Sequence, residues 1–269
     1  MATPNLEGKV ALVTGAARGQ GREHCLALAR AGAAIAALDI CRDLEVPTYP
    51  LGTRAELDAV VAAVEDLDRP ALGLVADVRS ADEVVAAVAE TVATFGRLDI
   101  VVNNAAIAGS GPFWELTEEQ WDAVVDTDLK GVWLVSKYAA PHLLKRPGGR
   151  IVNISSTAGA RGLAHFAHYS AAKHGVIGLT RSMAVELAPY GVTVNAILPG
   201  AVASPMLDGL AEELGVTPAD VHRVFLHHQL FEEVLEPREI TEALLWLVSD
   251  AARHITGHCL AVDGGWLVK

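Results

Sequence analysis

The sequence is poor in several kinds of residue, and each scarcity excludes a class of protein. Its 269 residues include only three cysteines, Cys25, Cys41 and Cys259, and no Cys-x-x-Cys pair. We therefore expect neither a disulfide framework nor a zinc site, and we expect a reducing, cytoplasmic location. Lys and Arg number 21 against 33 Asp and Glu, a net charge of -12. This balance argues against nucleic acid or an anionic membrane as a partner.

Long apolar runs and metal-binding clusters are also missing. No apolar stretch reaches the roughly 18 uncharged residues that a membrane helix needs. The N-terminal Met-Ala-Thr-Pro-Asn lacks a basic region followed by an apolar run, so we expect no signal peptide. His165, His168, His227 and His228 lack an evident third ligand, so no metal is expected.

The sequence instead alternates short apolar runs with longer amphipathic segments, and 51% of its residues are apolar. This alternation predicts βαβ units and a parallel sheet covered on both faces. The predicted strands are Val10–Thr14, Ala34–Asp39, Leu72–Ala76, Ile100–Val102, Arg150–Ile154, Thr193–Leu198 and Cys259–Val262. The predicted helices are Gly19–Ala31, Arg54–Leu67, Ala81–Phe95, Thr117–Leu144, Ala167–Ala188 and Arg238–Ser249.

These elements fit one α/β domain over residues 1–269. Its fold is predicted to be doubly wound and Rossmann-type, a seven-stranded parallel sheet with helices on both faces. Two stretches interrupt the alternation: an enlarged loop at 41–53, with two prolines and a glycine, and the segment Pro199–Pro237, with apolar residues and three histidines but no clear strand.

A glycine-rich loop, Thr14–Gly21, joins the first strand to the first helix. Gly15, Gly19 and Gly21 would let the backbone turn sharply and approach a pyrophosphate, next to Arg18 and Gln20. The helix N-terminus then offers free N–H groups to the anion. The alternative is a tight strand–helix turn, but such a turn needs only one glycine.

Asp39 ends the second strand, followed by Ile40, and bears on the choice of dinucleotide. A carboxylate there accepts hydrogen bonds from ribose hydroxyls and repels a 2′-phosphate, which favours NAD over NADP. Arg18 could meet a 2′-phosphate instead, and Asp39 could be only a cap or loop residue. No basic residue follows the strand before Arg42, so NAD remains the prediction.

Tyr169 and Lys173 lie four residues apart in a predicted helix. Positions i and i+4 share one face of a helix, so the two side chains are neighbours. A nearby ammonium favours phenolate and lowers the pKa of a phenol from about 10. Such a pair can pass a proton to or from an alcohol oxygen, although the spacing alone is a weak signal.

Further motifs follow in order: Asp77-Val78, Asn103-Asn104-Ala105, Ser155-Ser156 and Pro199-Gly200, each after a predicted strand. With the glycine loop and Tyr169…Lys173, they resemble the short-chain dehydrogenase/reductase family over nearly the whole chain. The resemblance implies an NAD-dependent oxidoreductase that interconverts a secondary alcohol and its ketone without a metal.

The resemblance also implies residue roles. Tyr169 would be the general acid/base, Lys173 would lower its pKa and bind the nicotinamide ribose, and Ser156 would hold the substrate oxygen. Ser155 is the weaker choice because adjacent strand residues point to opposite sides. Asn103 would lie at the adenosine side. The other implied cofactor-binding residues are Asp77 and Val78 near the adenine, Asn104, and Pro199, Gly200, Val202 and Ser204 in the nicotinamide pocket.

Two positions depart from the family pattern. Ala106 stands where the family usually has glycine, and Asp128 stands where it has a catalytic asparagine. That asparagine is thought to support a proton relay to the lysine. An ionised Asp128 near Lys173 would favour the ammonium and weaken its effect on Tyr169. A relay through backbone carbonyl and water could still work, so Asp128 stays among the candidate catalytic residues.

One subgroup is closest: Gly19-Gln20-Gly21-Arg22, Asp39-Ile40-Cys41 and Tyr49-Pro50-Leu51 resemble mycofactocin-coupled, carveol-dehydrogenase-like members. The resemblance implies tightly held NAD, with the 41–53 loop as a cover, and electron transfer to a peptide-derived redox carrier as a partner. Family members are commonly tetramers, so a homotetramer is expected.

The 201–231 segment is predicted to be a substrate lid. Its apolar residues, which suggest a cyclic or terpenoid alcohol, are Met206, Leu207, Leu210, Leu214, Val221, Phe225 and Phe231. A helix pair that packs its own apolar face would look the same, and His165 could touch the substrate mouth. Two alternatives remain for the function: an NADPH-dependent ketoreductase, and a catalytically impaired nucleotide-binding regulatory protein.

Overall fold

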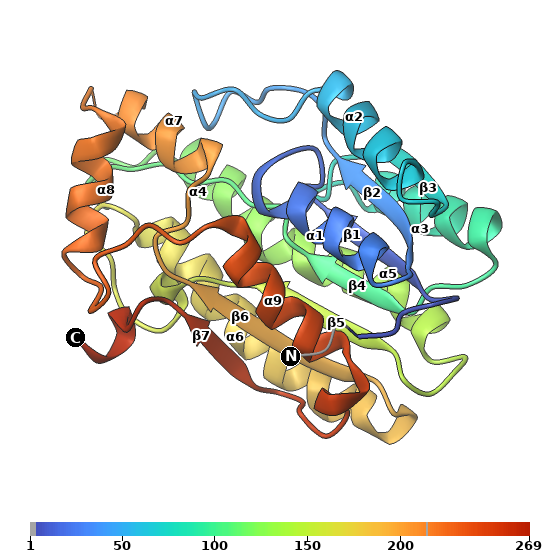
Figure 1. The fold of residues 1–269 in the computed structure, drawn as a ribbon. Coiled ribbons are helices and arrows are strands. Elements are labelled where there is room, and N and C mark those ends of the chain that lie inside the picture. Colours follow the sequence, from blue (N-terminus) through green and yellow to red (C-terminus); the bar gives the residue numbers. More distant parts are fainter. Residues whose placement is uncertain (1–3, 214) are drawn as a thin grey trace.

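A computed structural model describes residues 4–213 and 215–269. Seven parallel strands form one sheet in the order β3-β2-β1-β4-β5-β6-β7, with helices on both faces (Figure 1). The predicted doubly wound Rossmann-type fold is thereby confirmed. The strands are β1 Val10–Thr14, β2 Ala34–Asp39, β3 Ala71–Val75, β4 Ile100–Asn103, β5 Arg150–Ile154, β6 Thr193–Pro199 and β7 Cys259–Val262.

The strand order reverses at β1, which pairs with β2 on one side and β4 on the other. Connections leave the carboxyl ends of β1 and β4 in opposite directions, so a crevice forms there. The strand ends also explain why glycine, carboxylate and hydroxyl residues meet: Thr14, Asp39, Asn103 and Ile154 end four parallel strands at one edge. The fold therefore gathers most of the predicted motifs along this edge.

Two apolar cores cover the two faces of the sheet. One core joins α1 Gly19–Arg30, α2 Arg54–Glu65 and α9 Pro237–Val248 to one face. The other joins α3 Ala81–Phe95, α5 Gly131–Leu143 and α6 Ala167–Leu187 to the opposite face. The starts of α2 and α4 Glu118–Val125 follow from capping boxes, in which Thr53 and Thr117 accept hydrogen bonds from the third residue of each helix.

The predicted helix 117–144 is wrong in one respect, because a π-helical turn at Asp126–Lys130 separates α4 from α5. The turn carries Asp128 inward, where its carboxylate accepts a hydrogen bond from Ile107 N–H at 2.9 Å. After the turn, a Cβ on Gly131 would lie 2.8 Å from Cγ2 of Val78, so glycine allows the close approach of α5. Apolar periodicity continues through the turn, which is why the sequence did not reveal it.

The 201–231 segment contains two helices, α7 Pro205–Glu213 and α8 Pro218–Leu226, beyond the carboxyl edge of the sheet (Figure 1). Leu214, one of the apolar residues expected in this segment, lies outside the described residues, as do the first three residues of the chain. Among the residues that are described, no helix combines the length and apolar character needed to cross a lipid bilayer.

Candidate active site

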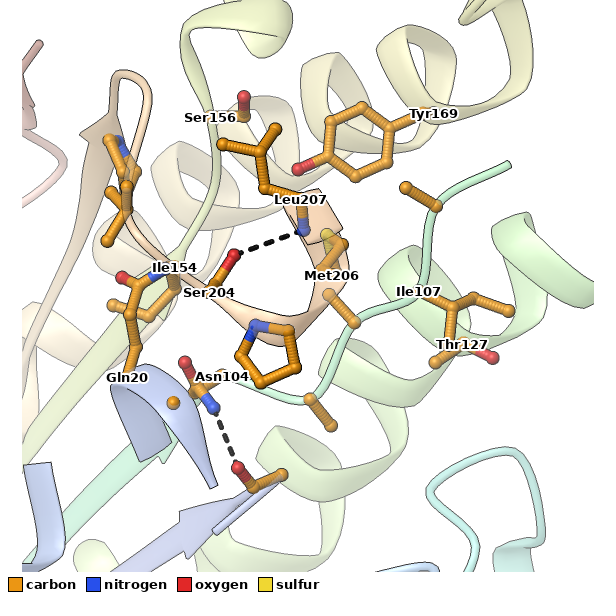
Figure 2. Close-up of a pocket in the computed structure, with 18 of the residues that line it drawn as sticks. Gln20, Asn104, Ile107, Thr127, Ile154, Ser156, Tyr169, Ser204, Met206 and Leu207 are labelled. Carbon is orange, nitrogen blue, oxygen red and sulfur yellow. Dashed lines mark hydrogen bonds between the residues drawn. The ribbon is translucent and has the colours of Figure 1, made fainter. Parts of the chain in front are cut away.

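One elongated cavity lies along the carboxyl edge of the sheet. Figure 2 shows Gln20 and Asn104 on one side of it and Ser156 and Tyr169 on the other. The predicted site residues that line it are Gly15, Arg18, Gly19, Gln20, Asp39, Ile40, Asp77, Val78, Asn104, Ser156, Tyr169, Lys173, Pro199, Gly200, Val202 and Ser204. The structure thus brings together residues from most of the length of the chain. Gly21 and Asp128 lie behind the lining.

The glycine loop forms a tight cradle. Gly15 and Gly19 have φ of 64° and 55°, in the left-handed region that favours glycine. A Cβ on Gly21 would lie 2.0 Å from the carbonyl oxygen of Gly15, so this position also requires glycine. Asn104 fastens the cradle, since its Nδ2 donates to the carbonyl oxygens of Thr14 at 2.9 Å and Gly15 at 3.1 Å.

The cradle leaves hydrogen-bonding groups for a ligand. The N-terminus of α1 has no side-chain cap among the described residues, so its first N–H groups face the cavity edge as an anion-binding end. Gln20 Oε1 is buried and has no hydrogen-bond partner within the described ranges. The residues here therefore fit a phosphate group with a polar neighbour.

Asp39 is buried at the end of β2. Its Oδ2 accepts a hydrogen bond from Ala17 N–H at 3.0 Å and its Oδ1 accepts one from Cys41 N–H at 3.1 Å. The backbone of Gly52 approaches so closely that a Cβ there would lie 2.8 Å from Oδ1. The carboxylate is therefore held by the glycine loop and by both ends of the 41–53 loop.

The nearby arginines are engaged by other groups. Arg18 donates to the carbonyl oxygen of Pro50 in the 41–53 loop. Arg42 pairs with Asp77 at 3.1 Å, and Arg79 pairs with the same carboxylate at 2.7 Å. Burial alone would raise the pKa of Asp77, but hydrogen bonds and charge from Arg79 hold that pKa below its usual value. The carboxylate of Asp77 is thus already neutralised at the cavity wall.

The expectation for Asn103 is wrong. Its Nδ2 donates to Ser136 at 3.0 Å and to Asn153 at 2.8 Å, beneath the cavity and away from its lining. Successive strand residues point to opposite sides, so Asn104 turns to the glycine loop while Asn103 faces α5 and β5. His165 also lies outside the lining and is exposed.

Ser156, Tyr169 and Lys173 meet at the other end of the cavity. Ser155 Oγ donates to the carbonyl oxygen of Lys173 at 3.0 Å, whereas Ser156 is the serine whose hydroxyl lies on the same side of the pocket as the Tyr169 hydroxyl (Figure 2). Helix α6 carries Tyr169 and Lys173 on one face, and Nζ of Lys173 lies 5.4 Å from the centre of the Tyr169 ring. The same Nζ donates to the carbonyl oxygen of Ile154 at 3.2 Å.

Asp128 and Lys173 form a fully buried ion pair, with Oδ2 3.1 Å from Nζ. Burial lowers the pKa of Lys173, but the charges of Asp128 and Tyr169 and the hydrogen bond to Asp128 together raise it by more, so the ammonium is favoured. The same pairing opposes the rise in the pKa of the Asp128 carboxyl that its own burial causes. Lys173 therefore keeps its positive charge near the Tyr169 ring, and the Asp128 carboxylate partly neutralises that charge.

The pKa of the Tyr169 phenol is raised above its ordinary value. Burial is the largest cause and Asp128 adds to it, while Lys173 and the Ser156 hydroxyl lower the pKa. The sequence prediction for Lys173 therefore has the correct sign, but burial outweighs it in the protein alone. A further positive charge in the cavity would lower this pKa again.

The end of the cavity beyond Tyr169 is apolar. Met206, Leu207 and Leu210 come from α7, Phe225 from α8, and Phe166 and Trp266 from the segments before α6 and after β7. The predicted lid thus lies at this end, although Phe231 is exposed. Phe166 and Trp266 were not among the residues predicted from the sequence, and Tyr49 was named only as part of a loop motif. The one signal in the sequence that could have identified these aromatic residues was their position next to a motif or a pair of glycines.

Comparison with known proteins agrees with this geometry. A family model described as "Enoyl-(Acyl carrier protein) reductase" matches residues 15–267. The chain is 43% identical to a (-)-trans-carveol dehydrogenase from Rhodococcus erythropolis, over 98% of this chain and 99% of the relative. It is 38% identical to a 3-oxoacyl-[acyl-carrier-protein] reductase from Staphylococcus aureus, over 96% and 97% of the two chains.

A solved structure is similar over its whole length. The crystal structure of carveol dehydrogenase from Mycobacterium avium in complex with NAD superimposes with a TM-score of 0.93. The two sequences are 38% identical, and the match covers 99% of this chain and 100% of the other. Both the fold and the length of the chain are therefore shared with this relative.

Proposed function

Because this chain belongs to the short-chain dehydrogenase/reductase family, we propose that it is an NAD-dependent oxidoreductase that interconverts an apolar secondary alcohol and its ketone. The observation that carries the proposal is a single cavity with Ser156, Tyr169 and Lys173 near one end and the glycine loop with Asp39 at the other. The apolar wall from α7, α8 and Trp266 supports a cyclic or terpenoid alcohol as the substrate class.

The residues at the end of the cavity with the glycine loop and Asp39 fit NAD. The Gly15–Gly21 cradle, which a Cβ would fill, and the uncapped start of α1 suit the pyrophosphate. Asp39 suits the adenosine ribose, and its charge disfavours a 2′-phosphate. Asp77, Val78 and Ile40 would form the adenine side, and Pro199, Gly200, Val202 and Ser204 the nicotinamide side. When bound, NAD supplies the acceptor for the hydride that leaves the carbinol carbon.

The chain's own residues handle the proton. Ser156 would hold the alcohol oxygen by a hydrogen bond and orient it toward the Tyr169 hydroxyl. Tyr169, as phenolate, would take the hydroxyl proton during oxidation and return it to the carbonyl oxygen during reduction. Lys173 favours the phenolate through its charge and keeps that charge through Asp128. Asp128 acts through Lys173 and does not line the cavity.

The two alternative functions are less well supported. An NADPH-dependent ketoreductase would have to accommodate a 2′-phosphate beside the buried Asp39, while Arg18 is bonded to Pro50. A regulatory protein without turnover would not need Ser156, Tyr169 and Lys173 at one wall of the same cavity. Titration with NAD and NADP separately would distinguish the first alternative.

Replacement of Tyr169 by phenylalanine tests the proposed proton transfer. A panel of cyclic and acyclic secondary alcohols is offered with NAD, and formation of NADH or reduction of an artificial acceptor is followed. We expect Tyr169→Phe to lower kcat by about 10²–10⁴-fold, because the general acid/base is lost. Tyr190→Phe, at an exposed tyrosine, is the matched control. Turnover by Tyr169→Phe at the parent rate would remove Tyr169 from the mechanism.

We further propose that NAD is held tightly and that electrons pass to a peptide-derived redox carrier. Support comes from the 41–53 loop, which contacts Arg18 and Asp39 at the adenosine end of the cavity. Native mass spectrometry should then find the dinucleotide bound to the purified protein. Apo-protein that exchanges NAD freely would contradict this proposal.

Assembly and location are proposed from the family resemblance and the composition. We propose a homotetramer in which α6 contributes to contacts between subunits, since Val185 on this helix is 77% exposed. Light scattering of the purified protein tests the number of subunits. The proposed cytoplasmic location rests on the low cysteine content and can be tested by cell fractionation.

A further inference from the structure

Tyr49 connects two parts of the cavity that are distant in the fold. Its loop begins just after Asp39, at the end where the glycine loop lies, yet the ring is buried beside Ile107 and Leu51. Tyr169 and Met206 pack against the same cluster. Tyr49 Oη also accepts a hydrogen bond from Ala108 N–H at 3.0 Å, so the ring is fixed at the apolar end of the cavity.

The ring of Tyr49 presses against the backbone of α7. A Cβ on Gly209 would lie 2.3 Å from Cγ and 2.7 Å from Cδ1 of Tyr49. Cβ atoms do not approach other atoms so closely, so the contact requires glycine at this position. Glycine is less favourable than alanine inside a helix, and here it gives the ring direct access to the helix backbone.

Helix α7 forms one wall of the apolar end through Met206, Leu207 and Leu210. A ring that fixes α7 therefore also fixes this wall. The other end of the same loop is joined to the glycine cradle, because Arg18 donates to Pro50 and Gly52 abuts Asp39. In Figure 1 this loop, between β2 and α2, extends across the top of the molecule toward α7.

We propose that Tyr49 is a positioning residue that links the dinucleotide end of the cavity to the substrate wall on α7. The inference rests on the proposed function for the identity of the two ligands. Binding of the dinucleotide at the glycine cradle restricts the motion of the 41–53 loop. Through the Tyr49–Gly209 contact, the restricted loop also restricts the motion of α7. Dinucleotide and substrate then bind cooperatively, because the first ligand has already restricted the wall that the second requires.

Hydrogen exchange of the α7 amides tests the link without knowledge of the substrate. Exchange is followed in protein from which bound dinucleotide has been removed and again after saturation with NAD, for the parent, Tyr49→Phe, Tyr49→Ala and Gly209→Ala. We expect NAD-saturated parent and Tyr49→Phe to protect α7, because the ring remains. Tyr49→Ala and Gly209→Ala should lose about tenfold or more of this protection, as expected for more frequent local opening. Tyr190→Ala, at an exposed tyrosine, is the matched control.

The double variant Tyr49→Gly/Gly209→Ala, compared with the single variants Tyr49→Gly and Gly209→Ala, distinguishes a specific contact from general damage. The added methyl group would lie 2.3 Å from Cγ, 2.5 Å from Cβ and 2.7 Å from Cδ1 of Tyr49. Glycine at position 49 removes all three atoms, so the methyl group should have no further effect in the double variant. A double variant whose loss is the sum of the single losses would overturn the contact as the cause. A parallel readout is the KM for cyclohexanol, which should rise in Tyr49→Ala more than the KM for 2-propanol.

The outcomes separate the link from the proposed function. If NAD binds the parent and α7 exchanges equally fast with and without Tyr49, the link is overturned. If NAD does not bind the parent, the proposed function fails. In that case the exchange of α7 in Tyr49→Ala and Tyr49→Phe, without ligand, still decides whether the ring holds the helix. Equal exchange in these two variants would overturn the positioning role.

Discussion

Replacement of Asp128 by asparagine removes the negative charge behind Lys173 and preserves the shape of the side chain. The Asp128 Oδ2 lies 3.1 Å from Nζ of Lys173, which lies 5.4 Å from the centre of the Tyr169 ring. The two distances together place the carboxylate oxygen no more than 8.5 Å from the ring centre. At about 8.5 Å and an effective dielectric constant of about 20, a carboxylate destabilises phenolate by about 2 kcal/mol.

This energy predicts the size of the effect. About 2 kcal/mol corresponds to roughly a thirtyfold change in the ratio of phenolate to phenol. The direction is clear, because the Asp128 carboxylate raises the pKa of Tyr169. Asp128→Asn should therefore lower the apparent pKa of Tyr169 in alcohol oxidation, because the carboxylate that raises it is gone. Oxidation needs phenolate, so its rate should reach a plateau at lower pH in the variant. Ketone reduction needs the protonated phenol, so its rate should also begin to fall at lower pH.

The assay is the pH dependence of kcat in both directions at saturating substrate. Asp126→Asn is the matched control, because Asp126 lies on the same turn but pairs with the exposed Lys130 at 3.3 Å. The amide introduced by Asp128→Asn would retain an acceptor for Ile107 N–H, although loss of one partner of a buried pair can destabilise the fold by about 3–5 kcal/mol. Thermal unfolding of each variant therefore accompanies the kinetics.

The expected shift occurs only if Lys173 stays protonated in the variant. Its pKa is raised by Asp128, and burial alone would lower it. If Lys173 lost its proton, Tyr169 would lose its cation and the pH profile would move to higher pH. A profile that moves upward, or one that does not move in Asp128→Asn, would refute the charge balance argued for this site.

Two further predictions concern the dinucleotide and the core. Asp39→Asn should reduce the ratio of kcat/KM for NAD to that for NADP by about tenfold or more, because a negative charge near the 2′-phosphate is removed. Asp58→Asn, at an exposed aspartate, is the control and should leave the ratio unchanged. An unchanged ratio in Asp39→Asn would contradict the role of Asp39. His24 donates from Nδ1 to Thr241 in the core, since the Thr241 hydroxyl donates to Pro237, and burial lowers the pKa of His24 to about 3. His24 therefore stays neutral in the folded protein, whereas in the unfolded chain it binds a proton below about pH 6.5. Proton binding stabilises only the unfolded chain, so His24 should lower the free energy of unfolding by about 2 kcal/mol between pH 7 and pH 5. His24→Asn should remove that part of the pH dependence in chemical denaturation, and a slope equal to that of the exposed His254→Asn would show that His24 does not titrate on unfolding.

Local sequence determined the sheet and the glycine cradle. All of the strands except β3 begin at the predicted residue and end within about one residue of prediction, because a buried parallel strand is a short apolar run bounded by turns. β3 begins at Ala71, just before the predicted start, and β4 includes Asn103. Gly15 and Gly19 could be identified because their backbone conformation depends on the residue itself. Tyr169 and Lys173 could be paired because helical periodicity alone places them on one face.

Only the tertiary structure decided what surrounds these residues. The π-helical turn that directs Asp128 to Lys173, the choice of Asn104 over Asn103, and the passage of Tyr49 to Gly209 all involve residues distant in the sequence. Such contacts depend on how elements pack, which periodicity and spacing do not encode. The sequence by itself therefore determined which groups form the site, and packing decided the charge that Tyr169 experiences and the wall opposite it.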